Sequence, residues 1–212
     1  MKSLADCKLY TFVDTAYLHG HAPEAVAQQL CDGGSDLIQL RAKNSSADEI
    51  RAMTEKILPV TRRANVGLVI NDHLEIAREL SAEICHLGQE DFFDAGFTNI
   101  SQLSTKNSQL KIGLSTHAPM QAQRAIEAGA DYVAIGPIFA TGTKPTAKPV
   151  TLEYVRWANE NVKIPWFAIG GINLQTLDDV LAAGAKRICV VSAILNSPDI
   201  AKTCAEFKQK LK

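Results

Sequence analysis

The sequence lacks an excess of charge of either sign. Its 212 residues include 22 Lys and Arg and 23 Asp and Glu, which gives a formal net charge of −1. No overall electrostatic field therefore draws the chain to nucleic acid or to an anionic membrane surface. We expect no nucleic-acid partner and no membrane partner, and any site for an anion has to be local.

Long apolar runs and paired cysteines are also missing. No segment approaches the ~20 consecutive apolar residues that a transmembrane helix needs, and Met1–Thr11 lacks the apolar core of a secretory signal. The cysteines stand singly, without a CxxC pair, at Cys7, Cys31, Cys85, Cys189 and Cys204. Scattered thiols in odd number predict buried cysteines in a reducing compartment rather than a disulfide framework or a zinc site. The expected localisation is cytoplasmic.

The sequence does contain a regular alternation of short apolar runs and amphipathic stretches. The apolar runs are typical of strands buried on both faces. The predicted strands are Lys8–Val13, Leu37–Arg41, Leu68–Asn71, Glu83–Leu87, Lys111–Ser115, Tyr132–Gly136, Trp166–Gly170 and Ile188–Ser192. The clearest predicted helices are Pro23–Cys31, Ser46–Arg63, Pro119–Ala128, Thr151–Asn161, Leu174–Ala183 and Pro198–Lys210.

This order of about eight strands, each followed by a loop or helix, predicts an α/β fold with a parallel sheet. Both a closed barrel and a doubly wound sheet fit the order. Polar residues follow many of the strands rather than gathering at one crevice, which favours the barrel. We predict a single-domain (β/α)₈ TIM barrel over residues 1–212, with short loops because such barrels typically have roughly 250 residues.

Cationic and amide side chains end the second predicted strand. Alternate residues of a strand share a face, so Gln39, Arg41 and Lys43 should point the same way. One amide and two cations suit a polyanion such as a diphosphate. The alternative is a solvated strand end whose charges have no ligand.

Carboxylates follow the third and fourth predicted strands. Asn71-Asp72 ends one strand and Asp91 follows the other, and neighbouring strand ends meet in a barrel. Two carboxylates, together with phosphate oxygens and water, are a typical Mg²⁺ site. The alternative is that Asp72 caps the helix that follows it and that Asp91 caps a short turn.

The fifth predicted strand ends in Ser115-Thr116-His117. Ser115 can donate to a substrate oxygen, or it can cap the next helix. His117 is ambiguous, since a general base needs a partner that the sequence does not reveal.

The last strands are followed by residues typical of phosphate binding. The loop after the sixth strand contains Thr141, Gly142, Thr143 and Lys144, whose hydroxyl, backbone and ammonium donors can surround phosphate oxygens. Glycines follow the seventh strand, and a short helical turn follows the eighth, where barrels usually bind phosphate. These features predict a phosphorylated substrate.

Taken in order, these segments resemble the motif series of thiamine-phosphate synthases, from about Leu9 to the last helix. The motifs are Gln39-Leu40-Arg41-Ala42-Lys43, Asn71-Asp72, His86-Leu87-Gly88-Gln89-Glu90-Asp91, Gly113-Leu114-Ser115-Thr116-His117, the loop from Gly136 to Lys144, and Ala168-Ile169-Gly170-Gly171-Ile172. The sequence departs from the pattern at Ser81–Cys85, at His73, where the family often has Arg, and at Pro149–Thr151. None of these departures removes a proposed ligand.

The resemblance implies a role for each matching position. The aminopyrimidine diphosphate would be held by Gln39, Leu40, Arg41, Ala42, Lys43, Asn71, Ser115 and Lys144. The thiazole phosphate would be held by Thr141, Gly142, Thr143, Gly171, Val191 and Ser192. Mg²⁺ would bind Asp72 and Asp91. The residues with a catalytic role would be Arg41, Lys43, Ser115 and Lys144.

The implied reaction joins the two substrates and releases pyrophosphate. The diphosphate leaves, the aminopyrimidine spreads the positive charge of its methylene carbon, and the thiazole nitrogen captures that carbon. Two rival interpretations stay open. One is a thiazole tautomerase-like relative, which His117 could serve as a proton shuttle, and the other is a non-catalytic sensor of thiamine precursors. The sequence also leaves open whether the chain forms a homo-oligomer.

Overall fold

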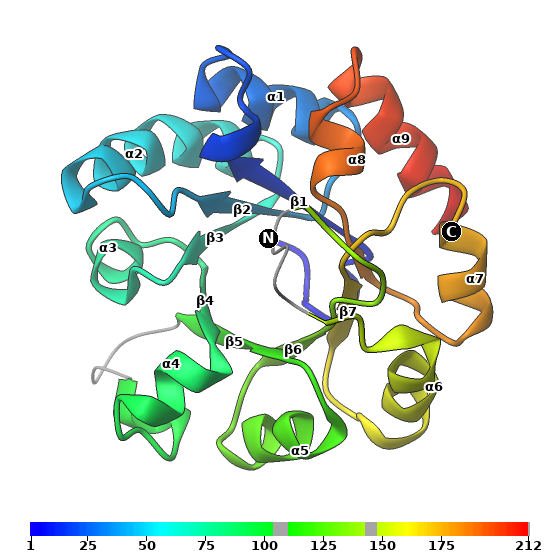
Figure 1. The fold of residues 1–212 in the computed structure, drawn as a ribbon. Helices are drawn as coiled ribbons and strands as arrows, with labels where there is room; N and C mark the ends of the chain where they lie inside the picture. Colours follow the sequence, from blue (N-terminus) through cyan, green and yellow to red (C-terminus); the bar gives the residue numbers. More distant parts are fainter. Residues whose placement is uncertain (104–109, 143–147, 212) are drawn as a thin grey trace.

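Eight parallel strands form a closed barrel in chain order, β1 to β8, with helices on the outside (Figure 1). The computed structural model describes residues 1–103, 110–142 and 148–211. The predicted (β/α)₈ TIM barrel is confirmed. The strands are β1 Leu9–Asp14, β2 Leu37–Arg41, β3 Gly67–Asn71, β4 Ile84–Gly88, β5 Lys111–Thr116, β6 Tyr132–Ile135, β7 Trp166–Ile169 and β8 Ile188–Cys189.

Helices follow the strands and cover the barrel. They are α1 Pro23–Asp32, α2 Ala47–Arg63, α3 Leu74–Glu79, α4 Gln89–Asp94, α5 Pro119–Glu127, α6 Thr151–Asn161, α7 Leu177–Ala182, α8 Ser192–Leu195 and α9 Ile200–Lys210. Two 3₁₀ turns, Thr15–Tyr17 and Ile100–Leu103, lie in the loops. The longest helix, α2, begins with a capping box, because Glu49 N donates to Ser46 Oγ and Ser46 N donates to the Glu49 carboxylate.

The last predicted strand is too long. β8 contains only Ile188 and Cys189, and Ser192 begins helix α8. Val190 N still donates to Tyr10 O at 3.0 Å, but Val191, with φ −113° and ψ −92°, turns the chain away from the barrel. An apolar run shows that a segment is buried, but it does not show where the segment stops being extended.

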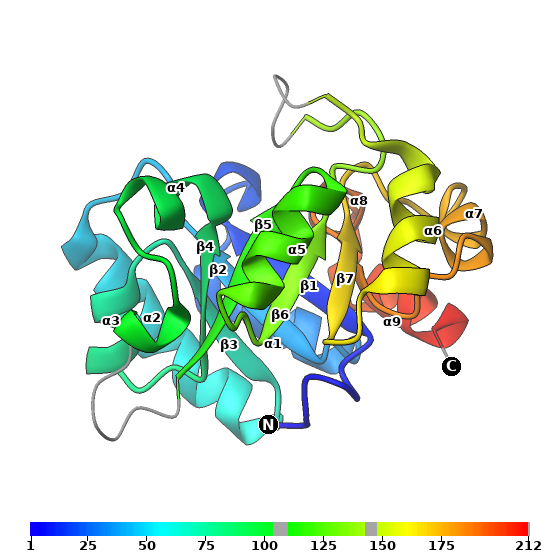
Figure 2. The ribbon, with the colours of Figure 1, turned by 90° about the horizontal axis from the view of Figure 1, so that it is seen from below.

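The two ends of the barrel differ in their loops. The side view shows the N-terminal segment below one end and the chain after β6 rising above the other (Figure 2).

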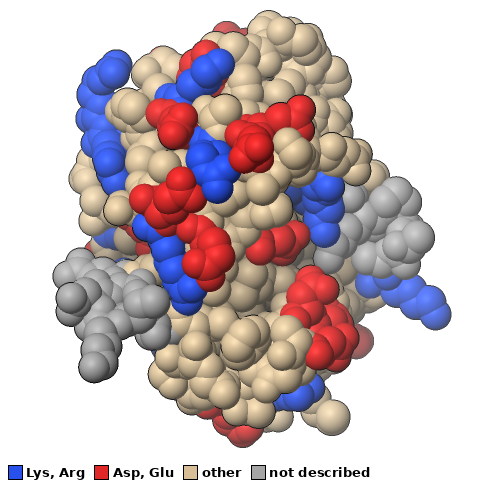
Figure 3. All heavy atoms as spheres, turned by 90° about the vertical axis from the view of Figure 1, so that its left-hand side faces the viewer, with Lys and Arg blue, Asp and Glu red and all other residues tan. Residues whose placement is uncertain are grey.

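On the side of the molecule where α2 and α3 lie, acidic and basic side chains alternate (Figure 3), as in the ion pairs of Arg51 with Asp48 and Glu79. Among the described residues, no helix is both long enough and apolar enough to cross a membrane.

Candidate active site

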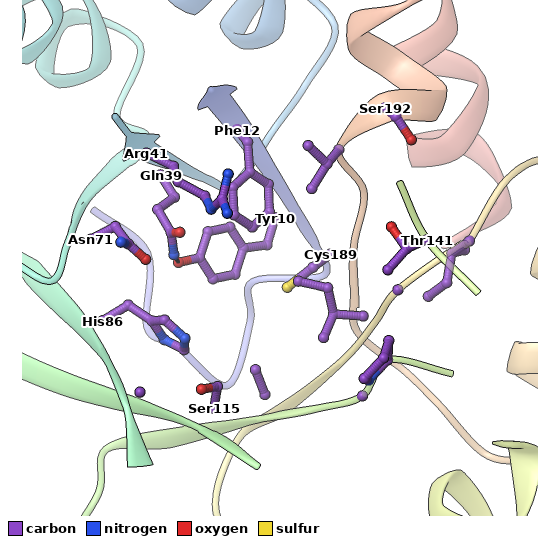
Figure 4. Close-up of a pocket in the computed structure, with 18 of the residues that line it drawn as sticks. Tyr10, Phe12, Gln39, Arg41, Asn71, His86, Ser115, Thr141, Cys189 and Ser192 are labelled. Atoms are coloured by element: carbon purple, nitrogen blue, oxygen red, sulfur yellow. Dashed lines mark hydrogen bonds between the residues drawn. The ribbon is translucent and has the colours of Figure 1, made fainter. Parts of the chain in front are cut away.

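One pocket lies at the C-terminal ends of the strands, where barrels keep their active sites. Residues from all eight strands or the loops after them contribute to it. Gln39, Arg41, Asn71, His86 and Ser115 lie on one side, and Thr141 and Ser192 lie across from them (Figure 4). The lining residues are Tyr10, Phe12, Gln39, Arg41, Lys43, Asn71, Asp72, His86, Gly88, Asp91, Ser115, His117, Ala134, Gly136, Pro137, Thr141, Ile169, Gly170, Gly171, Ile172, Cys189, Val191 and Ser192.

Arg41 is held in place by a buried carboxylate. Its Nη1 donates to Asp14 Oδ2 at 2.6 Å, and the Asp14 side chain is only 1% exposed. Asp14 ends β1 and also accepts from Ala16 N, so both of its oxygens are used. The guanidinium therefore reaches the pocket in a fixed direction while part of its fork remains available to an anion.

Lys43 and Asp72 approach each other at the rim of the pocket. Lys43 Nζ lies 3.6 Å from Asp72 Oδ2, and Asn71 Nδ2 donates to the same oxygen at 2.6 Å. Asp72 has a φ of +64° and does not cap α3, whose N-cap residue is His73. The capping alternative for Asp72 is therefore wrong, and its carboxylate lies at the pocket.

Asp91 folds back over the end of β4. A Cβ on Gly88 would lie 2.4 Å from Asp91 Oδ2, so the glycine makes room for this carboxylate. Asp91 lies in the first turn of α4, whose N-cap residue is Gly88, and Asp91 is therefore not a cap. Its exposed carboxylate has no hydrogen bond or ion pair with any residue that the structure describes.

Ser115 and His117 bring hydrogen-bonding groups from the end of β5. The N-cap residue of α5 is Ala118, so the capping alternative for Ser115 is also wrong. His117 Nδ1 lies 2.5 Å from Gly136 O. A carbonyl oxygen only accepts, so Nδ1 carries a proton and donates it to this contact.

The loops after β6 and β7 are packed together by glycine. Ile138 N donates to Ile169 O and Phe139 N donates to Gly170 O. A Cβ on Gly170 would lie 2.4 Å from Pro137 Cβ, and one on Gly171 would lie 2.7 Å from Ala140 O. Both glycines also have a positive φ, which a side chain would make costly. The backbone at Gly171 therefore lines the pocket directly.

Gln39 lies at the floor of the pocket in a chain of polar contacts. Its Nε2 donates to Tyr10 Oη at 2.5 Å, Tyr10 Oη is 3.2 Å from Tyr132 Oη, and Tyr132 Oη is 2.9 Å from His86 Nδ1. Burial raises the pKa of Tyr10 and of Tyr132 well above the ordinary value for tyrosine. Both phenols therefore stay neutral.

Comparison with known proteins agrees with this geometry. The sequence profile described as thiamine monophosphate synthase matches residues 9–194. The chain belongs to the thiamine monophosphate synthase family. It is 38% identical to a thiamine-phosphate synthase of Lawsonia intracellularis over 210 residues, covering 99% of this chain and 94% of that protein. It is 43% identical to a Thermus thermophilus thiamine-phosphate synthase over 187 residues, covering 84% of each.

A solved structure of the same family has the same fold. The thiamine phosphate pyrophosphorylase from Pyrococcus furiosus superposes with a TM-score of 0.86 at 28% sequence identity, covering 99% of this chain and 98% of that chain. The family assignment thus agrees with the resemblance that the ordered motifs indicate.

Most of the residues to which the family resemblance assigns a ligand lie at this pocket. Those that line it are Gln39, Arg41, Lys43, Asn71, Asp72, Asp91, Ser115, Thr141, Gly171, Val191 and Ser192. Leu40 and Ala42 are buried and do not line it, because they alternate with the inward-facing residues of β2. Gly142 does not line the pocket either. A Cβ added to Gly142 would lie 3.8 Å from Tyr17 Oη. Thr143 and Lys144 lie outside the described residues.

Two features of this family member are not among the residues that the sequence singles out. Asp14 fixes Arg41, and Tyr10 and Tyr132 connect Gln39 to His86. The acid at the end of an apolar run was a usable signal for Asp14, because Asp14 is the last residue of β1. The contact between Tyr10 and Tyr132 joins residues 122 positions apart and leaves no local pattern.

Proposed function

We propose that this chain is a transferase that condenses an aminopyrimidine diphosphate with a thiazole phosphate to give thiamine phosphate and pyrophosphate. The main support for this proposal is that the pocket has two regions of different chemistry. Gln39, Arg41 and Asn71 from β2 and β3 lie on one side, and the hydroxyl residues Thr141 and Ser192, which follow β6 and β8, lie on the other (Figure 4). Lys43 and Asp72, 3.6 Å apart, add charged groups after β2 and β3. Two anionic substrates need two such regions, and the names of the relatives agree with this reaction.

Arg41, Lys43, Asn71 and Ser115 would bind the aminopyrimidine diphosphate. Asp14 already orients Arg41, so little further side-chain entropy is lost when the guanidinium binds the diphosphate. Lys43 is half exposed and provides a second positive charge at the rim. Both cations oppose the negative charge that builds up as the C–O bond to the diphosphate breaks.

The carboxylates of Asp72 and Asp91 suit Mg²⁺. No group of three or more His, Cys, Asp or Glu side chains in the described parts of the chain could form a complete metal cage. Mg²⁺ is usually held by one or two carboxylates with substrate phosphates and water, which is what this pocket offers. When bound, the ion would offset the charge of the diphosphate and make it a better leaving group.

The thiazole phosphate would lie against Gly171, Val191, Ser192 and Thr141. Backbone N–H groups in the first turn of a helix have no acceptor within it, and α8 begins at Ser192 beside this part of the pocket. Bringing the thiazole nitrogen next to the methylene carbon lets a C–N bond form as pyrophosphate departs. No protein nucleophile takes part.

The direct test is pyrophosphate release by the purified protein. The assay contains aminopyrimidine diphosphate, thiazole phosphate and Mg²⁺, with each left out in turn, and mass spectrometry identifies the product. Release that needs all three and yields thiamine phosphate would support the proposal. A folded protein that binds thiazole phosphate but releases no pyrophosphate would exclude it, and it would point to the tautomerase-like or sensor alternatives.

A further inference from the structure

A chain of three hydrogen bonds crosses the barrel interior at the floor of the pocket (Figure 4 shows three of its four members). It runs from Gln39 on β2 through Tyr10 on β1 and Tyr132 on β6 to His86 on β4, with separations of 2.5, 3.2 and 2.9 Å. Gln39, Tyr10 and Tyr132 are buried. Tyr132 does not line the pocket, so it can affect a ligand only through its neighbours.

The two tyrosine rings are fixed by packing. Both meet Phe167 edge to face, at 5.4 and 5.6 Å between ring centroids, and Tyr10 also stacks on Phe12 at 5.2 Å. A Cβ on Gly113 would lie 2.0 Å from Tyr132 Cζ, so a glycine is needed where this ring sits. The phenol oxygens therefore have no freedom to seek other partners.

The number of available protons determines which group donates in each of the three hydrogen bonds. Burial raises the pKa of both phenols, so each keeps one proton. Three hydrogen bonds need three donors, and the two phenols supply two of them. One end of the chain must supply the third, either the Gln39 amide or His86 Nδ1. Gln39 Nε2 is the donor here, so Tyr10 donates to Tyr132, and Tyr132 donates to His86 Nδ1.

The direction decides what Gln39 presents to a ligand. One N–H of Nε2 is donated to Tyr10, so the carbonyl oxygen Oε1 is the hydrogen-bond acceptor that the amide offers to the pocket. Turning the amide over would require all three hydrogen bonds to reverse and the proton of the His86 ring to move to Nδ1. In an isolated side chain the same rotation would cost little, so the phenols are what make Gln39 an acceptor.

We propose that Tyr132 is a positioning residue that holds Gln39 with its carbonyl oxygen toward the substrate, so that the site selects a pyrimidine with an exocyclic amino group over one with an oxo group. The inference rests on the proposed function, because it assigns the pyrimidine to the Gln39 side of the pocket. An amino group donates to Gln39 Oε1, whereas an oxo group would place two acceptors against each other. Sites built to bind an N–H group reject analogues that lack it.

The test compares the amino and oxo forms of the pyrimidine diphosphate. For each form, kcat/KM is measured at saturating thiazole phosphate and Mg²⁺, and the amino-to-oxo ratio is taken. Dividing the ratio of a variant by that of the unmodified protein removes the intrinsic difference in reactivity. Tyr132→Phe deletes one phenol oxygen of the chain and should lower the ratio about tenfold, the size of one neutral hydrogen bond.

Tyr154→Phe is the matched control. It also removes a buried phenol with two partners, Thr116 Oγ1 and Ala118 O, each at 2.8 Å, but Tyr154 is outside the pocket. It should keep the ratio within about twofold. The KM for thiazole phosphate should be unchanged in Tyr132→Phe, whereas general loosening of the barrel would raise the KM of both substrates.

The outcomes separate this inference from the proposed function. If the unmodified protein makes no thiamine phosphate, the proposed function fails. If it makes thiamine phosphate and Tyr132→Phe keeps the unmodified ratio, the positioning role alone is wrong. Should Tyr132→Phe fold poorly by circular dichroism, Tyr10→Phe breaks the same chain and decides the question in the same way.

Discussion

Carboxylates lie at both ends of the barrel, but they use their oxygen atoms differently. At the N-terminal end, Asp36 accepts from Leu9 N, Glu83 from Leu68 N and Asp131 from Ile112 N, in each case from the strand before their own. At the C-terminal end, Asp72 and Asp91 face the pocket instead. The first group joins neighbouring strands, and the second remains available to a ligand.

Asp36 is the most heavily used of these acids. Besides Leu9 N it accepts from Lys8 N, from Lys2 Nζ at 2.7 Å and from Lys208 Nζ on α9. It therefore ties the N-terminal segment and the last helix to the barrel. Burial raises its pKa, but the bonds from Lys2, Lys208 and the backbone outweigh burial, and the pKa is lowered overall. Stability and ligand binding are thus assigned to opposite ends, as is usual for barrels.

The largest predicted effect is on activity at the C-terminal end. Asp91→Asn keeps the shape of the side chain but removes its charge, so we expect kcat/KM to fall about a thousandfold. The melting temperature should stay within about 2 °C, since Asp91 has no partner among the described residues. Steady-state kinetics and thermal melting measure the two effects. A large loss of stability with full activity would contradict the assignment of Asp91 to ligand binding.

The second effect is on stability at the N-terminal end. Asp36→Asn leaves two lysines and two backbone N–H groups with a neutral partner, and we expect a loss of about 3 kcal/mol. For a chain of this size that lowers the melting temperature by about 8 °C. Activity at 25 °C should stay within about twofold, because Asp36 lies far along the strand from the pocket. A variant that melts normally would show that Asp36 is not a structural tie.

The stabilisation by Asp36 should also depend on pH. Because the pKa of Asp36 is lowered in the folded state, its contribution is complete above the unfolded pKa of about 4 and is lost as the pH falls below it. The difference in melting temperature between the unmodified protein and Asp36→Asn should therefore be constant from pH 8 to about pH 5 and shrink toward pH 3. A difference that grows on acidification would reverse the sign and reject the assignment.

A smaller effect is predicted at Gly88. In Gly88→Ala the new Cβ would lie 2.4 Å from Asp91 Oδ2, the end of a movable side chain, so the carboxylate must shift while the fold stays intact. We expect the Mg²⁺ concentration for half-maximal activity to rise about tenfold with little change in melting temperature. A Mg²⁺ titration of activity measures this. An unchanged requirement would separate Asp91 from the metal.

The smallest effect is predicted at Glu83. Glu83→Ala removes the acceptor of Leu68 N and a 3.9 Å ion pair with Arg62, and we expect a loss of about 1 kcal/mol. Glu79→Ala is the control, because that carboxylate pairs with Arg51 on the surface and should contribute less than about 0.5 kcal/mol. Urea unfolding of both variants gives the comparison. Equal losses would show that the contact with the strand adds nothing.

The sequence predicted the barrel and much of the pocket, because both depend on local patterns. Each strand is a short apolar run, and the polar residues that follow it lie at one end of the barrel by geometry alone. Gln39, Arg41 and Lys43 line the pocket while Leu40 and Ala42 do not, as the alternation of a strand requires. The alternation gave this result for the side chains, and the family resemblance by itself did not.

What the sequence could not predict depends on contacts across the barrel. The Tyr10–Tyr132 contact and the ties of Asp36 to Lys2 and Lys208 connect residues that share no spacing. The capping alternatives at Asp72, Asp91 and Ser115 could be rejected only from backbone geometry, since Asp and Ser are common at helix starts. Backbone geometry also explains why β8 is shorter than its apolar run, because the chain turns out of the barrel at Val191.

The most direct test of the account is a crystal structure of the protein with thiamine phosphate, pyrophosphate and Mg²⁺ bound. We expect pyrophosphate beside Arg41 and Lys43, Mg²⁺ at the Asp72 and Asp91 carboxylates, and the phosphate of the product near Gly171 and Ser192. Finding the two anions exchanged, or bound away from the C-terminal end of the barrel, would contradict the assignment of binding and stability to opposite ends.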